Sequence, residues 1–101
     1  GDFNHSLPTT DPSIFPTTEQ WPEWLQKMPE DFLASQFYWA VDSSVASSRT
    51  IATSYTKGEN FLSVIDGFLV SDNIELLSVY GTNLEFKNSD HNPVTATFQL
   101  K

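Results

Sequence analysis

The sequence FLSVIDGFLVS, residues 61–71, is the stretch that decides how this chain is expected to fold. Its apolar residues predict a buried strand covered on both faces, and turn-forming residues flank it at Asn60 and Asp72. Asp66 lies in the middle of this run. Because a buried carboxylate is costly unless it is paired or hydrogen-bonded, we expect Asp66 to have a specific partner. That partner is either a set of backbone amides, which would be a structural role, or a functional side chain.

Further strands are predicted before and after this stretch. Residues 37–41, FYWAV, are rich in aromatic side chains, which favour strands. Residues 74–80, IELLSVY, predict another strand that runs antiparallel to its neighbour. Residues 94–100, VTATFQL, alternate apolar and polar side chains and so predict a strand with two unlike faces. We therefore expect residues 37–101 to be the β-rich part of the chain.

Residues 1–36 differ in composition, because prolines and paired threonines punctuate them. This pattern predicts a loop interrupted by short helices. One helix is expected at about residues 18–27, where a threonine would cap the N-terminus. Helical spacing would place four apolar side chains on one face of this helix, namely Trp21, Trp24, Leu25 and Met28. A second helical turn is expected at residues 29–33, PEDFL.

Length and charge limit the classes of function. A chain of 101 residues with 39% hydrophobic residues is one small domain or a portion of one, so residues 1–101 are treated as a single unit. Five Lys and Arg residues against thirteen Asp and Glu residues give a net charge of −8. Since binding of duplex DNA depends on cationic contacts to phosphates, this acidity argues against a duplex-binding surface. The sequence has no cysteine, which excludes a thiolate nucleophile and a cysteine zinc site.

Three polar groups could carry chemistry, namely residues 1–4 (GDFN), Asp66 and residues 89–91 (SDH). Each has a structural alternative, since Asx residues near a chain end usually form turns and SDH lies in a polar loop before Pro93. Together, however, they suggest a site. A carboxylate that orients a histidine fixes its tautomer and favours its protonated form, so Asp66 and His91 are a candidate pair.

The other polar side chains fit a site for a hard divalent cation. Mg²⁺ needs only one or two carboxylates, because water and substrate oxygens complete its octahedron. Asp2 and Asp90 are the candidate metal ligands, and Asn4 is a candidate for orienting the attacking water or a phosphate oxygen. His5 is interpreted as a local hydrogen-bonding residue. Three further residues either neutralise a substrate phosphate or are solvated loop residues, namely Arg49, Lys57 and Asn60.

Three motifs, in this order, resemble those of the endonuclease/exonuclease/phosphatase (DNase I-like) family. They are GDFN at residues 1–4, IDGFLVS at residues 65–71 and SDHNPV at residues 89–94. The resemblance implies an α/β (α+β) fold, namely the C-terminal half of a four-layer α/β sandwich with a mainly antiparallel sheet and short helices. Gly67 departs from the family pattern, in which an aromatic residue is usual, and this departure affects local strand packing rather than a catalytic group.

The same resemblance implies a function and a role for each motif residue. The chain would belong to a phosphoester hydrolase that uses a metal-activated water and requires Mg²⁺ or Mn²⁺. Its substrate would be a small, lipid or nucleic-acid phosphoester. The catalytic residues would be Asp2, Asn4, Asp66 and His91. Of these, Asn4 and His91 would contact the substrate, while Asp2 and Asp90 would hold the metal ion.

The resemblance also implies that this chain alone is incomplete. The family's principal metal-binding glutamate, an asparagine and a second histidine would all precede Gly1. Half a sandwich would expose one sheet face, which predicts either the missing N-terminal half of the domain or a second copy in a homodimer as partner. A different class stays open, a non-catalytic β-rich binding module with structural carboxylates. The two classes differ in whether Asp66 bonds to His91, and in whether Asp2, Asn4 and Asp90 meet at a cleft.

Overall fold

The chain is built almost entirely from short β-strands. The computed structural model describes residues 1–29, 31–32 and 36–101. Within these residues the helical structure is limited to one 3₁₀ turn, η1 (Pro12–Ile14), and nothing in them is a helix long and apolar enough to cross a membrane. The strands are, in chain order, β1 (His5–Ser6), β2 (Gln26–Lys27), β3 (Phe37–Ala40), β4 (Ser48–Arg49), β5 (Leu62–Ser63), β6 (Phe68–Ser71), β7 (Ile74–Gly81) and β8 (Val94–Leu100).

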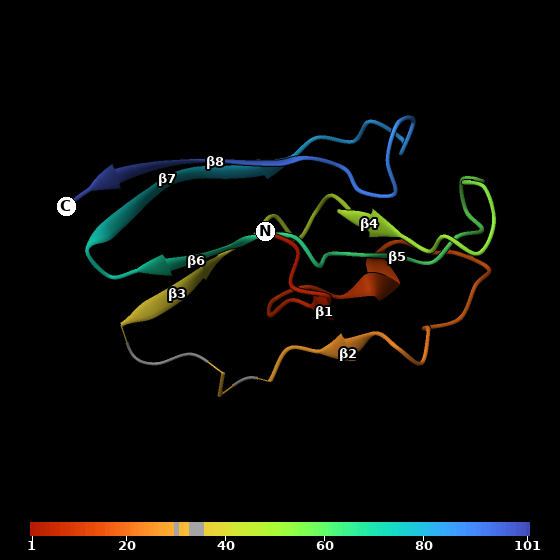
Figure 1. Cartoon of the computed structure of the whole chain (residues 1–101), viewed down its shortest axis with the longest axis horizontal. Coiled ribbons are helices and arrows are strands. Elements are labelled where there is room, and N and C mark those ends of the chain that lie inside the picture. Colours follow the sequence, from red (N-terminus) through yellow and green to blue (C-terminus); the bar gives the residue numbers. More distant parts are fainter. Residues whose placement is uncertain (30, 33–35) are drawn as a thin grey trace.

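The strands pair two by two, as Figure 1 shows. β7 and β8 form the longest ladder, antiparallel from Ile74 opposite Leu100 to Gly81 opposite Val94. β3 and β6 are also antiparallel, as are β4 and β5, whereas β1 and β2 run parallel. β6 leads directly into β7, and the N-terminus lies beside the start of β6 (Figure 1). The N-terminal residues are thereby brought next to the middle of the 61–71 stretch.

The predicted α/β fold is wrong. The described residues form a small all-β domain of several two-stranded sheets, and this is not the C-terminal half of a four-layer α/β sandwich. The helix expected at residues 18–27 is replaced by a turn, in which the amide of Leu25 donates to the carbonyl of Pro22 at 3.1 Å. The indole N–H of Trp21 donates to the carbonyl of Leu25 at 2.7 Å, and β2 then pairs with β1. Because proline and tryptophan are weak helix formers, these tertiary contacts override the helical spacing.

Three predicted strands are confirmed, and a fourth is divided. β3, β7 and β8 match their predicted ranges closely. The prediction of a single strand over residues 61–71 is wrong, because β5 and β6 occupy only parts of this stretch. Between them, the amides of Ile65 and Asp66 donate to Oγ of Ser47 instead of to a neighbouring strand. The second helical turn, expected at residues 29–33, falls partly outside the described residues.

Buried apolar side chains fix the backbone around Asp66. Full burial of a side chain of this size stabilises a fold by about 1.5–3 kcal/mol. The amide of Leu7 donates to the carbonyl of Val64 at 3.0 Å, which ties the N-terminal segment to the same place. The buried apolar residues here are Leu7, Leu25, Phe61, Val64 and Ile65.

Gly67 lies where a side chain has little room. A Cβ atom at this position would lie 3.0 Å from Cδ1 of Leu7 and 3.1 Å from the carbonyl oxygen of Ala40. It would also lie 3.1 Å from Cγ2 of Val41. The departure of Gly67 from the aromatic residue of the family pattern therefore has a steric basis, because β3 and the residue after it occupy the space.

Candidate functional site

Asp2 and Asp66 face each other across a short antiparallel pairing. The two residues form a β-bridge, and next to it the amide of Phe3 donates to the carbonyl of Ile65 at 2.9 Å. Residues directly opposite in an antiparallel pair project their side chains to the same face of the sheet. Two carboxylates are thus brought together, and like charges in this arrangement destabilise a sheet unless a positive charge compensates them.

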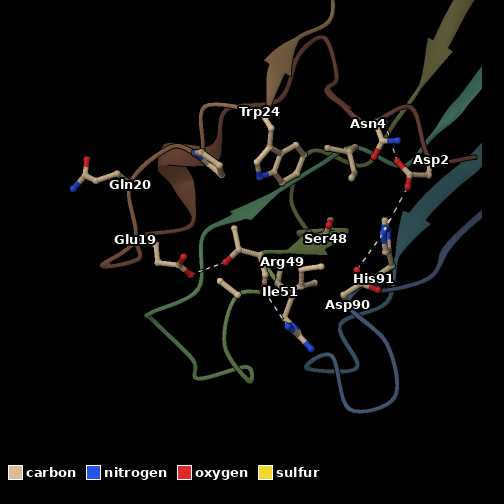
Figure 2. A pocket seen from close by; sticks show the side chains of 14 residues that line it. Asp2, Asn4, Glu19, Gln20, Trp24, Ser48, Arg49, Ile51, Asp90 and His91 are labelled. Atoms are coloured by element: carbon tan, nitrogen blue, oxygen red, sulfur yellow. Dashed lines mark hydrogen bonds and ion pairs between the residues drawn. The ribbon is translucent and has the colours of Figure 1, made fainter.

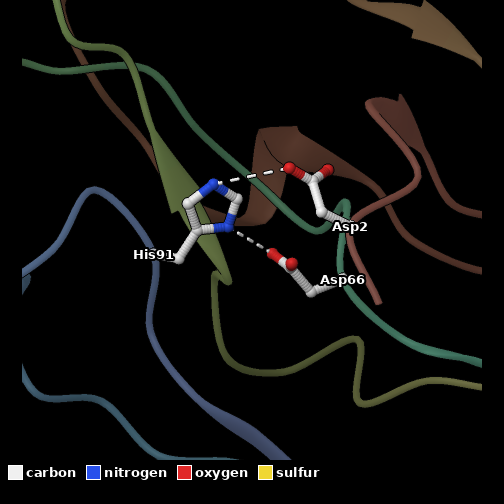
Figure 3. Close-up of side chains that lie close together, drawn as sticks. All are labelled: Asp2, Asp66 and His91. Atoms are coloured by element: carbon white, nitrogen blue, oxygen red, sulfur yellow. Dashed lines mark hydrogen bonds and ion pairs between the residues drawn. The ribbon is translucent and has the colours of Figure 1, made fainter.

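His91 lies between these two carboxylates, as Figure 3 shows. Its Nδ1 lies 2.7 Å from Oδ2 of Asp66, and its Nε2 lies 3.7 Å from Oδ2 of Asp2. Oδ2 of Asp90 lies 4.0 Å from the same Nε2. The histidine is held in place by a backbone bridge to Ser48 of β4. The predicted pairing of Asp66 with His91 is therefore confirmed as a contact.

Ser47 holds both sides of this site and was not predicted from the sequence. Its hydroxyl oxygen accepts hydrogen bonds from the amide of Ile65 at 2.9 Å and from the amide of Asp66 at 3.1 Å. Its carbonyl accepts a hydrogen bond from the amide of Asn92 at 2.9 Å. The residue is only 1% exposed. One buried serine thus fixes the segment of the carboxylate and the loop of the histidine.

Asn92 anchors the histidine loop from its other side. Its side-chain amide donates to the carbonyl of Ala46 at 3.0 Å, and its side-chain oxygen accepts from the amide of Leu84 at 3.0 Å. It is 3% exposed. Asn92 and Ser47 are both small polar residues in segments that the sequence marks as loops, and no local pattern distinguishes such residues from solvated ones.

The surroundings of His91 favour its protonated form. Burial is the largest influence and lowers the pKa of His91, but the hydrogen bond to Asp66 and the negative charges of Asp66, Asp90 and Asp2 together outweigh it. The pKa is consequently raised above its ordinary value of about 6.5. An ionised carboxylate can only accept, so Nδ1 carries a proton in both charge states. The proton that is gained or lost is therefore on Nε2, which faces Asp2 and Asp90.

Nε2 of His91 faces a pocket of about 580 Å³, shown in Figure 2. Asp66 is not among the lining residues and lies behind the imidazole as its hydrogen-bond acceptor. Beyond the polar end the pocket extends past Trp24 towards Gln20 (Figure 2). The polar end is formed by four of the predicted site residues, namely Asp2, Asn4, Asp90 and His91.

The turn that was the structural alternative for residues 1–4 is also present. The amide of Asn4 donates to Oδ1 of Asp2 at 2.8 Å, and Asn4 has a φ of 51°, a conformation that asparagine tolerates better than most residues. The turn occupies Oδ1 alone. Oδ2 of Asp2 is the atom that faces His91, so one carboxylate both shapes the turn and contributes to the pocket.

Oxygen atoms on the pocket side of His91 could hold a hard divalent cation. Asp2, Asp66 and His91 each offer a ligand atom within 4.8 Å of the others. Oδ2 of Asp66 is already hydrogen-bonded to the imidazole, however, so we favour Asp2 and Asp90 as ligands. Their side chains are 39% and 45% exposed, and Asn4 lines the same pocket. Carboxylate and amide oxygens suit Mg²⁺ or Mn²⁺ better than they suit softer metals.

The remaining polar candidates have local roles or lie elsewhere. His5 is a local hydrogen-bonding residue, as predicted, since its Nδ1 lies 2.9 Å from a backbone carbonyl oxygen. Arg49 lines the pocket, but its guanidinium donates to carbonyls of the 50–53 segment and points away from His91 (Figure 2). Asn60 is 1% exposed and bonds to the same carbonyls, so it is not a solvated loop residue. Lys57 lines a different pocket.

No protein-family model matches this sequence, and comparison with curated proteins and with solved structures gave no significant match. The resemblance to the endonuclease/exonuclease/phosphatase family rests on the three motifs alone. Function is therefore argued from the geometry of the pocket.

Proposed function

We propose that this chain carries part of the active site of a divalent-metal-dependent phosphoester hydrolase. The observation that supports it is the position of His91, whose Nδ1 lies 2.7 Å from Asp66 while its Nε2 lies 3.7 Å from Asp2. Asn4 and Asp90 line the same pocket. A binding module with a structural carboxylate would need the first of these contacts only. The convergence of the other groups favours a hydrolase.

Each residue has a distinct role in this proposal. Asp66 orients the imidazole and favours its charged form. His91 holds a proton on Nε2, where it binds a phosphate oxygen or protonates the leaving alcohol. Asp2 and Asp90 would hold Mg²⁺ or Mn²⁺, and such an ion supplies stabilisation of phosphate charge and activation of water. Asn4 would orient a phosphate oxygen or the attacking water through its side-chain amide.

The protonation state of His91 matches the needs of the reaction. In hydrolysis, a water oxygen forms a bond to phosphorus and gives up a proton to solvent, while the bond from phosphorus to the leaving oxygen breaks. The leaving oxygen takes a proton from Nε2 of His91, and solvent returns a proton to the imidazole. Without a metal ion, the raised pKa keeps a larger fraction of His91 protonated near neutral pH. With a cation on Asp2 and Asp90, the hydrogen bond and the charge of Asp66 are the influences that still favour the protonated form. The same imidazolium adds positive charge at the polar end of an otherwise acidic pocket.

The family resemblance implies that a glutamate, an asparagine and a second histidine come from outside these residues, and we propose the same for this site. The metal affinity and the turnover of the 101 residues alone should then be low. The net charge of −8 favours a small or lipid phosphoester over duplex DNA as substrate.

The test combines hydrolysis with metal binding. Hydrolysis of bis(p-nitrophenyl) phosphate is measured with Mg²⁺ or Mn²⁺ for this chain and for a version extended upstream. We expect activity mainly in the extended version, with His91→Ala reducing it by about 100-fold or more. His5→Ala is the matched control, because His5 lies outside the pocket lining, and it should leave the activity unchanged.

Metal binding has a readout that does not depend on turnover. Mn²⁺ broadens the NMR signals of nearby nuclei, and we expect the broadening to centre on Asp2, Asn4 and Asp90. The double variant Asp2→Asn, Asp90→Asn should remove it. Absence of both the broadening and any hydrolysis, in either version of the chain, would favour the non-catalytic binding module.

A further inference from the structure

Trp24 is the one tryptophan of the described chain that presents its indole to the pocket. It is 58% exposed and lines the pocket (Figure 2). The other tryptophans pack on aromatic partners, with ring centroids 5.5 Å apart for Trp21 and Phe61 and 4.9 Å apart for Trp39 and Phe3. Trp39 is half-buried and Trp21 is 39% exposed, but neither lines the pocket and both rings are held by these aromatic contacts. An indole left open in a concave site is instead typical of a surface that receives a ligand.

The turn before β2 fixes the backbone at Trp24. The amide of Leu25 donates to the carbonyl of Pro22 at 3.1 Å, and the indole N–H of Trp21 donates to the carbonyl of Leu25 at 2.7 Å. Leu25 is 3% exposed and is packed in the core. Because its neighbour in the sequence faces inward, Trp24 is directed outward at the pocket rim. The backbone position from which the indole projects is therefore set by the fold.

The pocket around this indole has a negative charge balance. Three carboxylate residues line it, Asp2, Glu19 and Asp90, against Arg49 and His91. Glu19 lies on the Trp24 side of the pocket (Figure 2), where its Oε1 accepts from the hydroxyl of Thr50 and the amide of Phe61. Asp2 and Asp90 lie at the polar end, where the proposed metal ion would balance their charge. The guanidinium of Arg49 is engaged by the carbonyls of the 50–53 segment. The chain as a whole carries a net charge of −8. Such a field attracts cations and repels a second anionic group on a ligand.

We propose that the Trp24 side of the pocket binds an organic cation, a quaternary or protonated amine, by cation–π contact with the indole and attraction to the carboxylate of Glu19. A pocket of about 580 Å³ is within the range of small-molecule sites. The inference rests on the proposed function in one respect, since it makes the cation the alcohol half of the phosphoester whose phosphate lies at His91. The substrate class is then a phosphoester of an amino alcohol.

The binding test uses choline chloride, without metal ion, followed by tryptophan fluorescence and calorimetry. The neutral comparison ligand is 3,3-dimethylbutan-1-ol, which has the same shape without the charge. We expect saturable binding of choline that is between about threefold and thirtyfold tighter than that of the alcohol, and a loss of the same size in Trp24→Leu. Trp24→Phe keeps an aromatic face and should lose less.

Tyr80→Leu is the matched control, because Tyr80 is 50% exposed and is not part of the pocket lining. It should bind choline as the wild type does. Circular dichroism checks that Trp24→Leu remains folded. The inference is overturned if the neutral alcohol binds as tightly as choline, or if Trp24→Leu keeps the affinity of the wild type.

The outcome separates this inference from the proposed function. Choline binding that depends on Trp24, together with neither hydrolysis nor Mn²⁺ binding in this chain or its upstream-extended version, would support the cation site and overturn the hydrolase. Hydrolysis of bis(p-nitrophenyl) phosphate in a protein that does not bind choline would overturn the cation site alone.

Discussion

Replacing Ser47 with alanine removes one acceptor that holds two adjacent backbone amides. The hydrogen bond from Ile65 to Oγ of Ser47, at 2.9 Å, is buried, and the one from Asp66, at 3.1 Å, is partly buried. A buried donor left without a partner costs about 1–3 kcal/mol, and a partly buried donor can recover some of this through water. We therefore expect Ser47→Ala to lower the free energy of unfolding by about 2–4 kcal/mol.

Urea unfolding followed by tryptophan fluorescence measures this free energy. Ser48→Ala is the matched control, because Ser48 is the next residue, is 5% exposed and has no side-chain hydrogen bond within the described part of the chain. It should change the stability by less than about 1 kcal/mol. In a domain of about this size, the loss in Ser47→Ala corresponds to a fall in Tm of roughly 10–25 °C. Hydrogen exchange of the Ile65 and Asp66 amides should also accelerate.

The role of Ser47 would be contradicted by wild-type behaviour of the alanine variant. If Ser47→Ala and Ser48→Ala unfold at the same urea concentration, and if the amides of Ile65 and Asp66 exchange at the wild-type rate, then this hydroxyl does not hold the site. The positions of the carboxylate and the histidine would then need another cause, such as the buried apolar residues around Ile65.

Three further predictions concern the same region. Asp66→Asn should lower the pKa of His91, because it removes a hydrogen-bonded negative charge while burial still disfavours the imidazolium, and NMR titration of the ring protons measures it. Protonated His91 should stabilise the fold fully below the unfolded pKa of about 6.5, and this contribution should be lost as pH rises through the raised folded pKa. Urea unfolding at several pH values measures this loss, and His91→Gln should not show it. Gly67→Ala should lower stability by about 1–3 kcal/mol, since its Cβ would lie 3.1 Å from the carbonyl oxygen of Ala40, and an unchanged Tm would contradict the packing.

The parts of the fold that could be predicted are those with a local pattern. The residues of β7 and β8 alternate or are apolar in a way that favours a strand. The two strands pair from end to end, apart from an irregularity between Leu76 and Ser78. The helix at residues 18–27 was predicted from an equally local pattern and is wrong. Its residues are fixed by partners distant in the sequence, such as Ser6, whose carbonyl accepts from the amide of Met28 at 2.9 Å. Apolar spacing identifies which side chains are suited to burial, but the backbone that buries them depends on these long-range contacts.

The residues of the site also divide into those that a local pattern predicts and those that long-range contacts fix. The contact of Asp66 with His91 could be anticipated, because a carboxylate within an apolar run needs a partner. Ser47 could not, since a serine in a polar segment carries no sign that its hydroxyl accepts hydrogen bonds from two amides eighteen and nineteen residues away in the sequence. Trp24 was predicted to share one face of a helix with Trp21, Leu25 and Met28, and it is instead in a turn, 58% exposed in the pocket.

The carboxylate cluster is hard to explain by stability alone. A side chain opposite Asp66 in an antiparallel pair would stabilise the sheet better if it were neutral, because like charges in this position repel. The turn at residues 1–4 uses Oδ1 of Asp2 only, and an asparagine would serve it as well. Protonated His91 compensates the charges, but once it loses its proton, Asp2, Asp66 and Asp90 surround a neutral ring. A cation from solution can then balance the negative charge on Oδ2 of Asp2 and on Oδ2 of Asp90. The turn and the Asp66–His91 pair give these two oxygens no other role, and binding of a cation would account for their position.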